Sequence, residues 1–155
     1  MPRLKACTLA VLDRVRKELA PRTLIAGGRS MGGRVASMLA ADGSAFDALL
    51  LFAYPLHPAG NPEKLRDAHL PRITMPVLCV NGTRDALCGR DLMERAIAGV
   101  SAPWRMHWAE GADHSFHVLK SSGRSDDDVL AEIGEVSQTW LAGLPAASAK
   151  RSDHV

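Results

Sequence analysis

Cysteine is scarce in this sequence and poorly placed for pairing. Its three cysteines, Cys7, Cys79 and Cys88, are odd in number, far apart, and form no Cys-x-x-Cys pair. Disulfide frameworks and zinc sites are built from cysteines at short, paired spacings, so we expect neither here. Sparse, unpaired cysteines suit a reducing compartment. We therefore expect the protein to be cytoplasmic.

Long apolar runs and an excess of one charge are also missing. The longest apolar run, residues 48–56 with its proline counted, is far too short to span a bilayer. Arg3, Lys5 and Asp13 interrupt the first helix-like stretch, which argues against a signal peptide. The net charge is +2, with 19 basic and 17 acidic residues spread along the chain. This balance does not argue for a nucleic acid or an anionic membrane as a partner, and we expect neither.

What is present is an alternation of helices and strands. Residues 3–20 predict a helix whose apolar face consists of Leu4, Thr8, Val11, Val15 and Leu19. Strands are predicted at residues 23–26, 48–54, 76–81 and 104–108, and further helices at residues 31–41, 91–98 and from Asp126 onward. This order predicts an α/β three-layer sandwich with a mostly parallel sheet of about four strands. We expect one domain over residues 1–144 and a frayed tail over residues 145–155.

Two segments carry further expectations. The last strand alternates Trp104, Met106 and Trp108 with Arg105 and His107, which is typical of a sheet edge. Residues 55–76 form a long, proline-rich loop that we interpret as a rim or lid over a site. Within that loop, residues 63–69 have the composition for one or two helical turns.

The motif Gly-x-Ser-x-Gly occupies residues 28–32, between the first predicted strand and the second predicted helix. A serine on a sharp strand-to-helix turn needs small neighbours, because its strained backbone brings adjoining turns close together. Ser30 would then stand clear of the sheet at a helix N-terminus, which favours developing negative charge. The Met31 N–H is the expected first oxyanion donor. The alternative is a glycine-rich turn with an incidental serine.

Three side chains suited to acyl transfer follow successive strands. Ser30 comes after the first strand, Asp85 after the third and His114 after the fourth. The carboxyl ends of parallel strands gather at one edge of a sheet. A serine hydroxyl needs an imidazole base, and a carboxylate holds that imidazole in the right tautomer. The order Ser, Asp, His is that of the α/β-hydrolases.

Four motifs carry a resemblance to a known family, and they are Gly-Gly-Arg-Ser-Met-Gly-Gly-Arg at residues 27–34, Tyr-Pro-Leu-His-Pro at 54–58, Asn-Gly-Thr-Arg-Asp at 81–85 and Gly-Ala-Asp-His-Ser-Phe at 111–116. Over residues 3–143 the chain resembles the dienelactone-hydrolase-like branch of the α/β-hydrolases. It is also similar to the hydrolase-like domain of a subunit of a eukaryotic histone-acetyltransferase complex. The resemblance implies Ser30 as nucleophile, Asp85 as orienting acid and His114 as base, and it implies no particular substrate.

The chain departs from that family at its N-terminal end. Family members usually carry several further strands before the first helix seen here, and a loop after one of them supplies the second oxyanion donor. No residue of this sequence matches that donor. We expect the chain to be N-terminally short, either through a misassigned start or by nature. The strand at residues 23–26 would then have a free edge, which predicts a homodimer through that edge.

Several residues have alternative interpretations. Asp113 neighbours His114 and is the alternative orienting carboxylate. His114 and His117 are spaced for a metal pair but lack a third ligand, so no metal or other cofactor is expected. Arg29 and His57 are the candidates for substrate binding; the alternatives are an ion pair or solvent for Arg29 and loop hydrogen bonding for His57. We also expect His69 to form hydrogen bonds within its loop and Cys79 to lie in the core. Cys88 is expected either to line the site or to be a buried structural thiol.

Together these observations predict a serine hydrolase that cleaves a small ester, thioester or lactone through an acyl-enzyme. The alternative is a non-catalytic hydrolase-fold module for protein interaction, or an inactive truncated homologue. Loss of one oxyanion donor typically lowers the rate about 10²–10³-fold. A non-catalytic or inactive protein therefore stays as the alternative hypothesis.

Overall fold

Residues 1–145 are described by a computed structural model, with helices and strands alternating along the chain. In order these are α1 (Pro2–Leu19), β1 (Ile25–Arg29), α2 (Met31–Ala41), β2 (Ala48–Phe52), the 3₁₀ turn η1 (Leu70–Arg72), β3 (Val77–Gly82), α3 (Arg90–Ile97), β4 (Trp104–Ala109), the 3₁₀ turn η2 (Lys120–Ser122) and α4 (Asp126–Ala142). The tail expected at residues 145–155 lies outside the described residues except for Pro145. Within residues 1–145, no helix combines the length and hydropathy needed to cross a bilayer.

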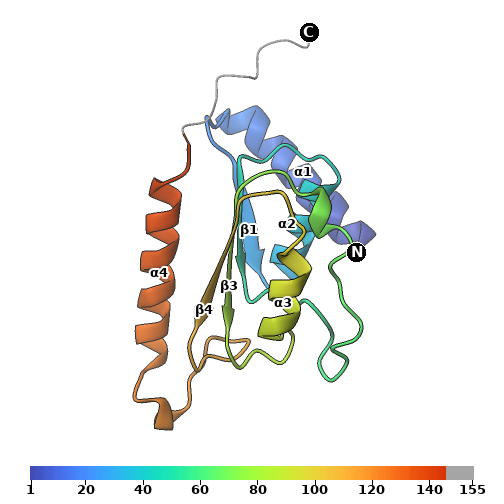
Figure 1. Ribbon diagram of the computed structural model, residues 1–155. Helices are drawn as coiled ribbons and strands as arrows, with labels where there is room; N and C mark the ends of the chain where they lie inside the picture. Colours follow the sequence, from blue (N-terminus) through green and yellow to red (C-terminus); the bar gives the residue numbers. More distant parts are fainter. Residues whose placement is uncertain (146–155) are drawn as a thin grey trace.

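The four strands form one parallel sheet in the order β1-β2-β3-β4. Helix α4 covers one face, while α1, α2 and α3 lie on the other (Figure 1). The two faces bury separate apolar clusters, one around Leu49, Leu51 and Val77, the other around Leu78, Val80 and Val129. Adjacent residues of β3 face opposite clusters, as the pleat of a strand covered on both sides requires. The expected three-layer α/β sandwich is confirmed.

Strand β1 begins two residues later than the sequence predicts and runs on through the glycines. Its register with β2 pairs Ile25 with Ala48 and Arg29 with Phe52. Before the strand, the Leu24 N–H donates to the Asp47 carboxylate instead of the ladder, at 2.7 Å. Apolarity alone does not reveal a strand that continues through Gly27 and Gly28, which is why the boundary was misplaced.

Helices α4 and α1 bury their apolar side chains to different degrees. Helix α4 begins with a capping box between Ser125 and Asp128 and buries Val129 and Ile133. The apolar face predicted for α1 is wrong in part, because its only buried residue is Leu12. Three members of the predicted face are exposed to solvent, namely Leu4 at 47%, Val11 at 56% and Leu19 at 72%. The packed side of α1 is centred on Leu12 and includes the half-buried Thr8 and Val15, so it overlaps the predicted face in part.

The alternation predicted for β4 is confirmed. Trp104, Met106 and Trp108 pack against the cluster on the α2–α3 face of the sheet. On the opposite side, His107 contacts Glu132 of α4, with 2.6 Å between Nε2 and the carboxylate. Strand β4 is one edge of the sheet, and β1 is the other.

The long segment between β2 and β3 is anchored in the core. Leu56, Leu70 and Ile73 are fully buried. The helical turns expected at residues 63–69 do not form, and a single 3₁₀ turn, η1, follows at Leu70–Arg72 instead. The burial of Leu70 and Ile73 on either side of Pro71 explains why the turn forms there.

Strand β1 has a partner on one side only among the described residues. Strand β1 has no bulge, no proline and no inward-pointing charge that would discourage its outer N–H and C=O groups from pairing with another strand. The exposed Leu4, Val11 and Leu19 of α1 add apolar surface on the same N-terminal part of the chain. A free strand edge and uncovered apolar side chains each favour association.

We therefore predict that the purified chain forms a homodimer through the edge of β1. Two copies related by a two-fold axis would pair their β1 strands and continue the sheet across the interface. Light scattering coupled to size exclusion tests this. A soluble monomer near the 16.6 kDa chain mass at all concentrations would contradict the prediction.

Candidate active site

Ser30 occupies a sharp turn between β1 and α2. Its backbone has φ 51° and ψ −118°, a conformation that costs a non-glycine residue energy and persists only where the surroundings enforce it. The Ser30 N–H donates to the Phe52 carbonyl at 2.8 Å, and the Ser30 carbonyl accepts from Arg34 N–H at 3.1 Å. The first bond continues the β1–β2 ladder and the second begins the helix. The chain therefore changes from strand to helix within this one residue.

Three of the four glycines around Ser30 give this turn its clearance. A Cβ on Gly33 would lie 2.5 Å from the Gly28 carbonyl oxygen, and a Cβ on Gly27 would lie 2.1 Å from that of Leu50. Gly28 has φ 155° and would place a Cβ 3.1 Å from the α2 backbone. A Cβ on Gly32 would meet nothing within 4 Å. All four glycines at positions 27, 28, 32 and 33 are expected from the sequence to give clearance, and this expectation is wrong for Gly32 alone.

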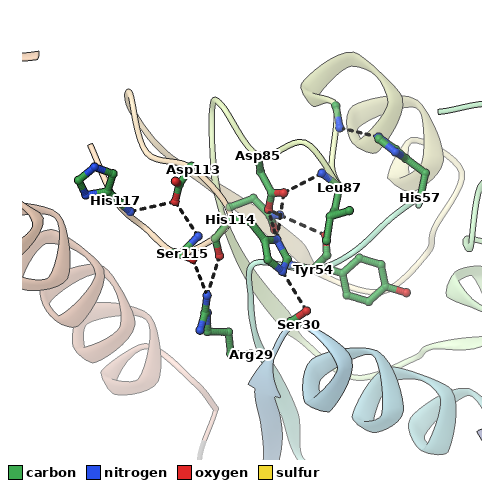
Figure 2. A network of polar contacts seen from close by, with 12 residues as sticks. Arg29, Ser30, Tyr54, His57, Asp85, Leu87, Asp113, His114, Ser115 and His117 are labelled. Carbon is green, nitrogen blue, oxygen red and sulfur yellow. Dashed lines mark hydrogen bonds and ion pairs between the residues drawn. The ribbon is translucent and has the colours of Figure 1, made fainter. Parts of the chain in front are cut away.

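Asp85 follows β3 and is held by buried donors. Its side chain is fully buried, and its two oxygens accept from Leu87 N–H at 2.8 Å and from the Asn81 side-chain amide at 3.1 Å (Figure 2). Asn81 also bonds both backbone groups of Tyr54, at 3.1 and 3.2 Å. These contacts use every polar atom of the Asn81 amide. Sequence reasoning missed Asn81 as a positioning residue; the available signal was one amide in an otherwise apolar strand.

The loops after β3 and β4 are tied together, which brings His114 to Asp85. Arg84 N–H donates to the Ala112 carbonyl at 2.9 Å, and Gly111 N–H donates to the Thr83 hydroxyl at 2.9 Å. A Cβ on Gly82 would lie only 2.1 Å from the Ala112 oxygen. A larger residue at Gly82 would therefore push the His114 loop away from β3.

Ser30, His114 and Asp85 form a continuous chain of contacts. Nε2 of His114 lies 2.9 Å from the Ser30 Oγ, and its Nδ1 lies 2.9 and 3.0 Å from the Asp85 oxygens (Figure 2). Asp113 points elsewhere, because its carboxylate accepts from the N–H groups of Ser115 and His117 at 2.7 and 3.0 Å. Of the two carboxylates considered from the sequence, Asp85 is the one beside His114.

Comparison with known proteins agrees with this geometry. A family model described as "Alpha/beta hydrolase domain" matches residues 1–142. The chain belongs to the α/β-hydrolase family.

Solved structures of similar fold include several hydrolases. A putative dienelactone hydrolase from Klebsiella pneumoniae is 23% identical, with a TM-score of 0.69 over 90% of this chain and 62% of that one. An α/β serine hydrolase homologue from Coxiella burnetii is 20% identical, with a TM-score of 0.63 over 89% of this chain and 57% of that one. Esterase 2 from Thermogutta terrifontis is 20% identical, with a TM-score of 0.63 over 88% and 63% of the two chains. The present chain thus spans 57–63% of the length of these three structures.

In this α/β-hydrolase domain, the two residues considered for substrate binding instead hold loops. The Arg29 guanidinium donates to the His114 carbonyl at 3.0 Å and to the Ser115 hydroxyl at 3.3 Å, so it positions the histidine loop (Figure 2). His57 is 5% exposed, bonds the Pro58 carbonyl through Nδ1 and accepts from Gly89 N–H at 3.1 Å. Loop hydrogen bonding, the alternative considered for His57, is what the structure has.

A second serine–histidine contact lies inside the domain. The Ser37 Oγ is 2.8 Å from Nε2 of His69, and the Tyr54 hydroxyl is 3.3 Å from the same nitrogen. Ser37 lies within α2, is fully buried and donates its proton to the Arg34 carbonyl at 2.8 Å. Burial, followed by the charges of Arg34 and Arg72, lowers the pKa of His69 to about 4. This neutral, enclosed pair lacks a carboxylate on the histidine and has the character of a structural contact.

The remaining candidates are structural. Cys79 is fully buried in β3, and Cys88 is 2% exposed. Burial raises the pKa of Cys88 to about 12, so it is a buried thiol and not a reactive one. His117 bonds Asp126 at 2.9 Å, and this contact raises the pKa of the imidazole. No cluster of three metal-ligating side chains occurs within residues 1–145.

The glycine contacts yield a prediction for a matched pair of variants. Gly27→Ala should lower the free energy of unfolding by about 1–3 kcal/mol, because the new Cβ enters the space of the Leu50 carbonyl. Gly32→Ala should leave it unchanged or raise it by up to about 1 kcal/mol, because alanine is favoured in a helix and the site is open. Urea denaturation measures both. Equal losses would contradict the prediction.

Proposed function

We propose that this chain is a serine hydrolase in which Ser30 is the nucleophile, His114 the general base and Asp85 the orienting acid. The observation that carries the proposal is the contact chain from Ser30 Oγ through His114 to the buried Asp85. A serine hydroxyl becomes nucleophilic when an imidazole removes its proton during attack. The small hydrolases of similar fold support the reaction class.

The proposed reaction has two steps, acylation of Ser30 and hydrolysis of the acyl-enzyme. The Ser30 Oγ attacks the carbonyl carbon of a small ester, thioester or lactone, while Nε2 of His114 takes its proton. Asp85 holds the Nδ1–H and stabilises the imidazolium that forms. The imidazolium returns the proton to the leaving oxygen or sulfur, which leaves an acyl group on Ser30. Water then attacks the acyl-enzyme with His114 again acting as base.

The oxyanion of the tetrahedral intermediate is assigned to the N-terminus of α2. Among residues 1–145, the Met31 N–H has no acceptor, because it belongs to the first helical turn. We propose Met31 N–H as one donor. No second donor is assigned among the described residues, and a missing donor costs about 10²–10³ in kcat. We therefore expect slow turnover. We also propose the cytoplasm as the compartment in which the protein acts.

Covalent labelling tests the nucleophile directly. A fluorophosphonate probe should label the wild-type protein on Ser30 and fail to label Ser30→Ala, because labelling requires an activated serine. Ser37→Ala is the matched control: it removes the serine of the other serine–histidine contact and should keep the label. Mass spectrometry of the labelled peptide locates the adduct. Equal labelling of Ser30→Ala and wild type would refute the assignment, and an unlabelled wild type would favour the non-catalytic interaction module.

Substitution of the orienting acid provides a second test. Asp85→Asn should slow p-nitrophenyl acetate hydrolysis strongly, up to about 10⁴-fold, because an amide favours the wrong tautomer of His114. It should also lower the free energy of unfolding by about 1–3 kcal/mol, since its NH₂ must face one of two donors, the Leu87 N–H or the Asn81 amide.

Asp113→Asn is the control for that variant, because Asp113 supports the turn without touching His114. It should hydrolyse the ester at nearly the wild-type rate. Thermal unfolding confirms that both variants are folded at the assay temperature. If Asp113→Asn were the slower enzyme, the orienting role would belong to Asp113.

A further inference from the structure

A second hollow lies away from the triad, between α2 and the segment that leads to η1. Arg34, Arg66 and Arg72 line it together with His69, Met38 and Leu65, and its volume is about 340 Å³. This volume is at the lower end of the range for small-ligand sites. Three guanidinium groups beside apolar side chains are an arrangement that the proposed hydrolase chemistry leaves unexplained.

Two of these arginines have no counter-charge within the described chain. Neither the Arg34 nor the Arg66 guanidinium has an acceptor or carboxylate partner among residues 1–145. The Nε of Arg34 is buried and unsatisfied. Burial, with Arg66 contributing, lowers the pKa of Arg34 from its ordinary value, which reflects the cost of holding this charge unpaired. An unpaired buried donor is costly unless a ligand or water satisfies it.

The third arginine is held in place at the rim. Arg72 donates to the carbonyls of Ala41 and Ala68, at 3.4 and 3.3 Å, and lies 3.8 Å from the Asp42 carboxylate. Asp42 is shared, because it also pairs with Lys5. Asp42 therefore offsets the Arg72 charge only in part, while Arg34 and Arg66 face the hollow with two positive charges that have no carboxylate partner among residues 1–145.

We propose that this hollow binds the phosphate group of a small organic phosphomonoester. A phosphate dianion matches the two uncompensated charges, and guanidinium forks bind its oxygens through paired, charge-assisted hydrogen bonds. The organic part would lie against Met38 and Leu65, the apolar side of the hollow.

The site stands apart from the proposed catalysis. Arg34 lies one helical turn beyond Ser30, and its guanidinium takes no part in the contacts of His114 or Asp85. Binding can therefore be measured in the Ser30→Ala protein. A failure of the hydrolase assignment would leave the result of that measurement unaffected.

Calorimetric titration with phenyl phosphate and with inorganic phosphate tests the proposal in wild type and Ser30→Ala. Arg34→Gln and Arg66→Gln should each weaken binding about tenfold or more, because each removes a charged donor. Arg95→Gln is the matched control, since Arg95 is an exposed arginine of α3 outside the hollow. It should bind as the wild type does. Tighter binding of phenyl phosphate than of inorganic phosphate would identify an organic ligand, and equal binding would identify free phosphate.

Three results would overturn the proposal. One is the absence of saturable phosphate binding by the wild-type protein. Another is equal affinity of Arg66→Gln and Arg95→Gln for phenyl phosphate. This comparison decides the test even if the Arg34→Gln variant does not fold. The last is binding of benzoate as tight as that of phenyl phosphate, which would mean that the hollow does not select phosphate.

Discussion

The close approach of two backbone segments at the β1–α2 turn governs the rest of the site. The carbonyl of Gly28 lies so near Gly33 that a Cβ there would be 2.5 Å from its oxygen. This contact forces the whole change of direction onto Ser30, whose φ of 51° is the consequence. The same turn directs the hydroxyl toward His114 and starts α2 beside it, where the first N–H groups have no acceptor within the helix. The strained backbone and the direction of the side chain thus have one cause.

A second constraint acts on the other two residues of the site. Asp85 and His114 belong to loops that follow different strands, and hydrogen bonds from Thr83 and Arg84 hold those loops together. Gly82 lets them approach, because no side chain stands between it and Ala112. Arg29 then secures the histidine loop from the side of β1. The parallel sheet brings the three loops to one edge, and these contacts set their spacing.

Much of this arrangement could be predicted from the sequence. The order of helices and strands was enough to predict the fold. The polar residues that follow the strands were enough to predict that Ser30, Asp85 and His114 lie together. Asn81 was missed because a buried amide has no periodicity to reveal it. The role of Arg29 was missed for another reason: its partners are 85 and 86 residues away, and one of them is a backbone carbonyl. The face of α1 was misjudged because helical periodicity shows which side is apolar and not which side meets a neighbour.

Helix α2 contributes both to the Ser30 turn and to the arginine hollow. Val35, Ala36 and Leu39 are at most 4% exposed, so the helix is fixed against the sheet. Its N-terminus lies at the Ser30–His114 contact, and Arg34 and Met38, four residues apart, line the arginine hollow from the same helix. Four residues of helix advance about 6 Å, so Ser30 and Arg34 keep a short, fixed separation. One rigid helix therefore sets the position of both Ser30 and the arginine hollow.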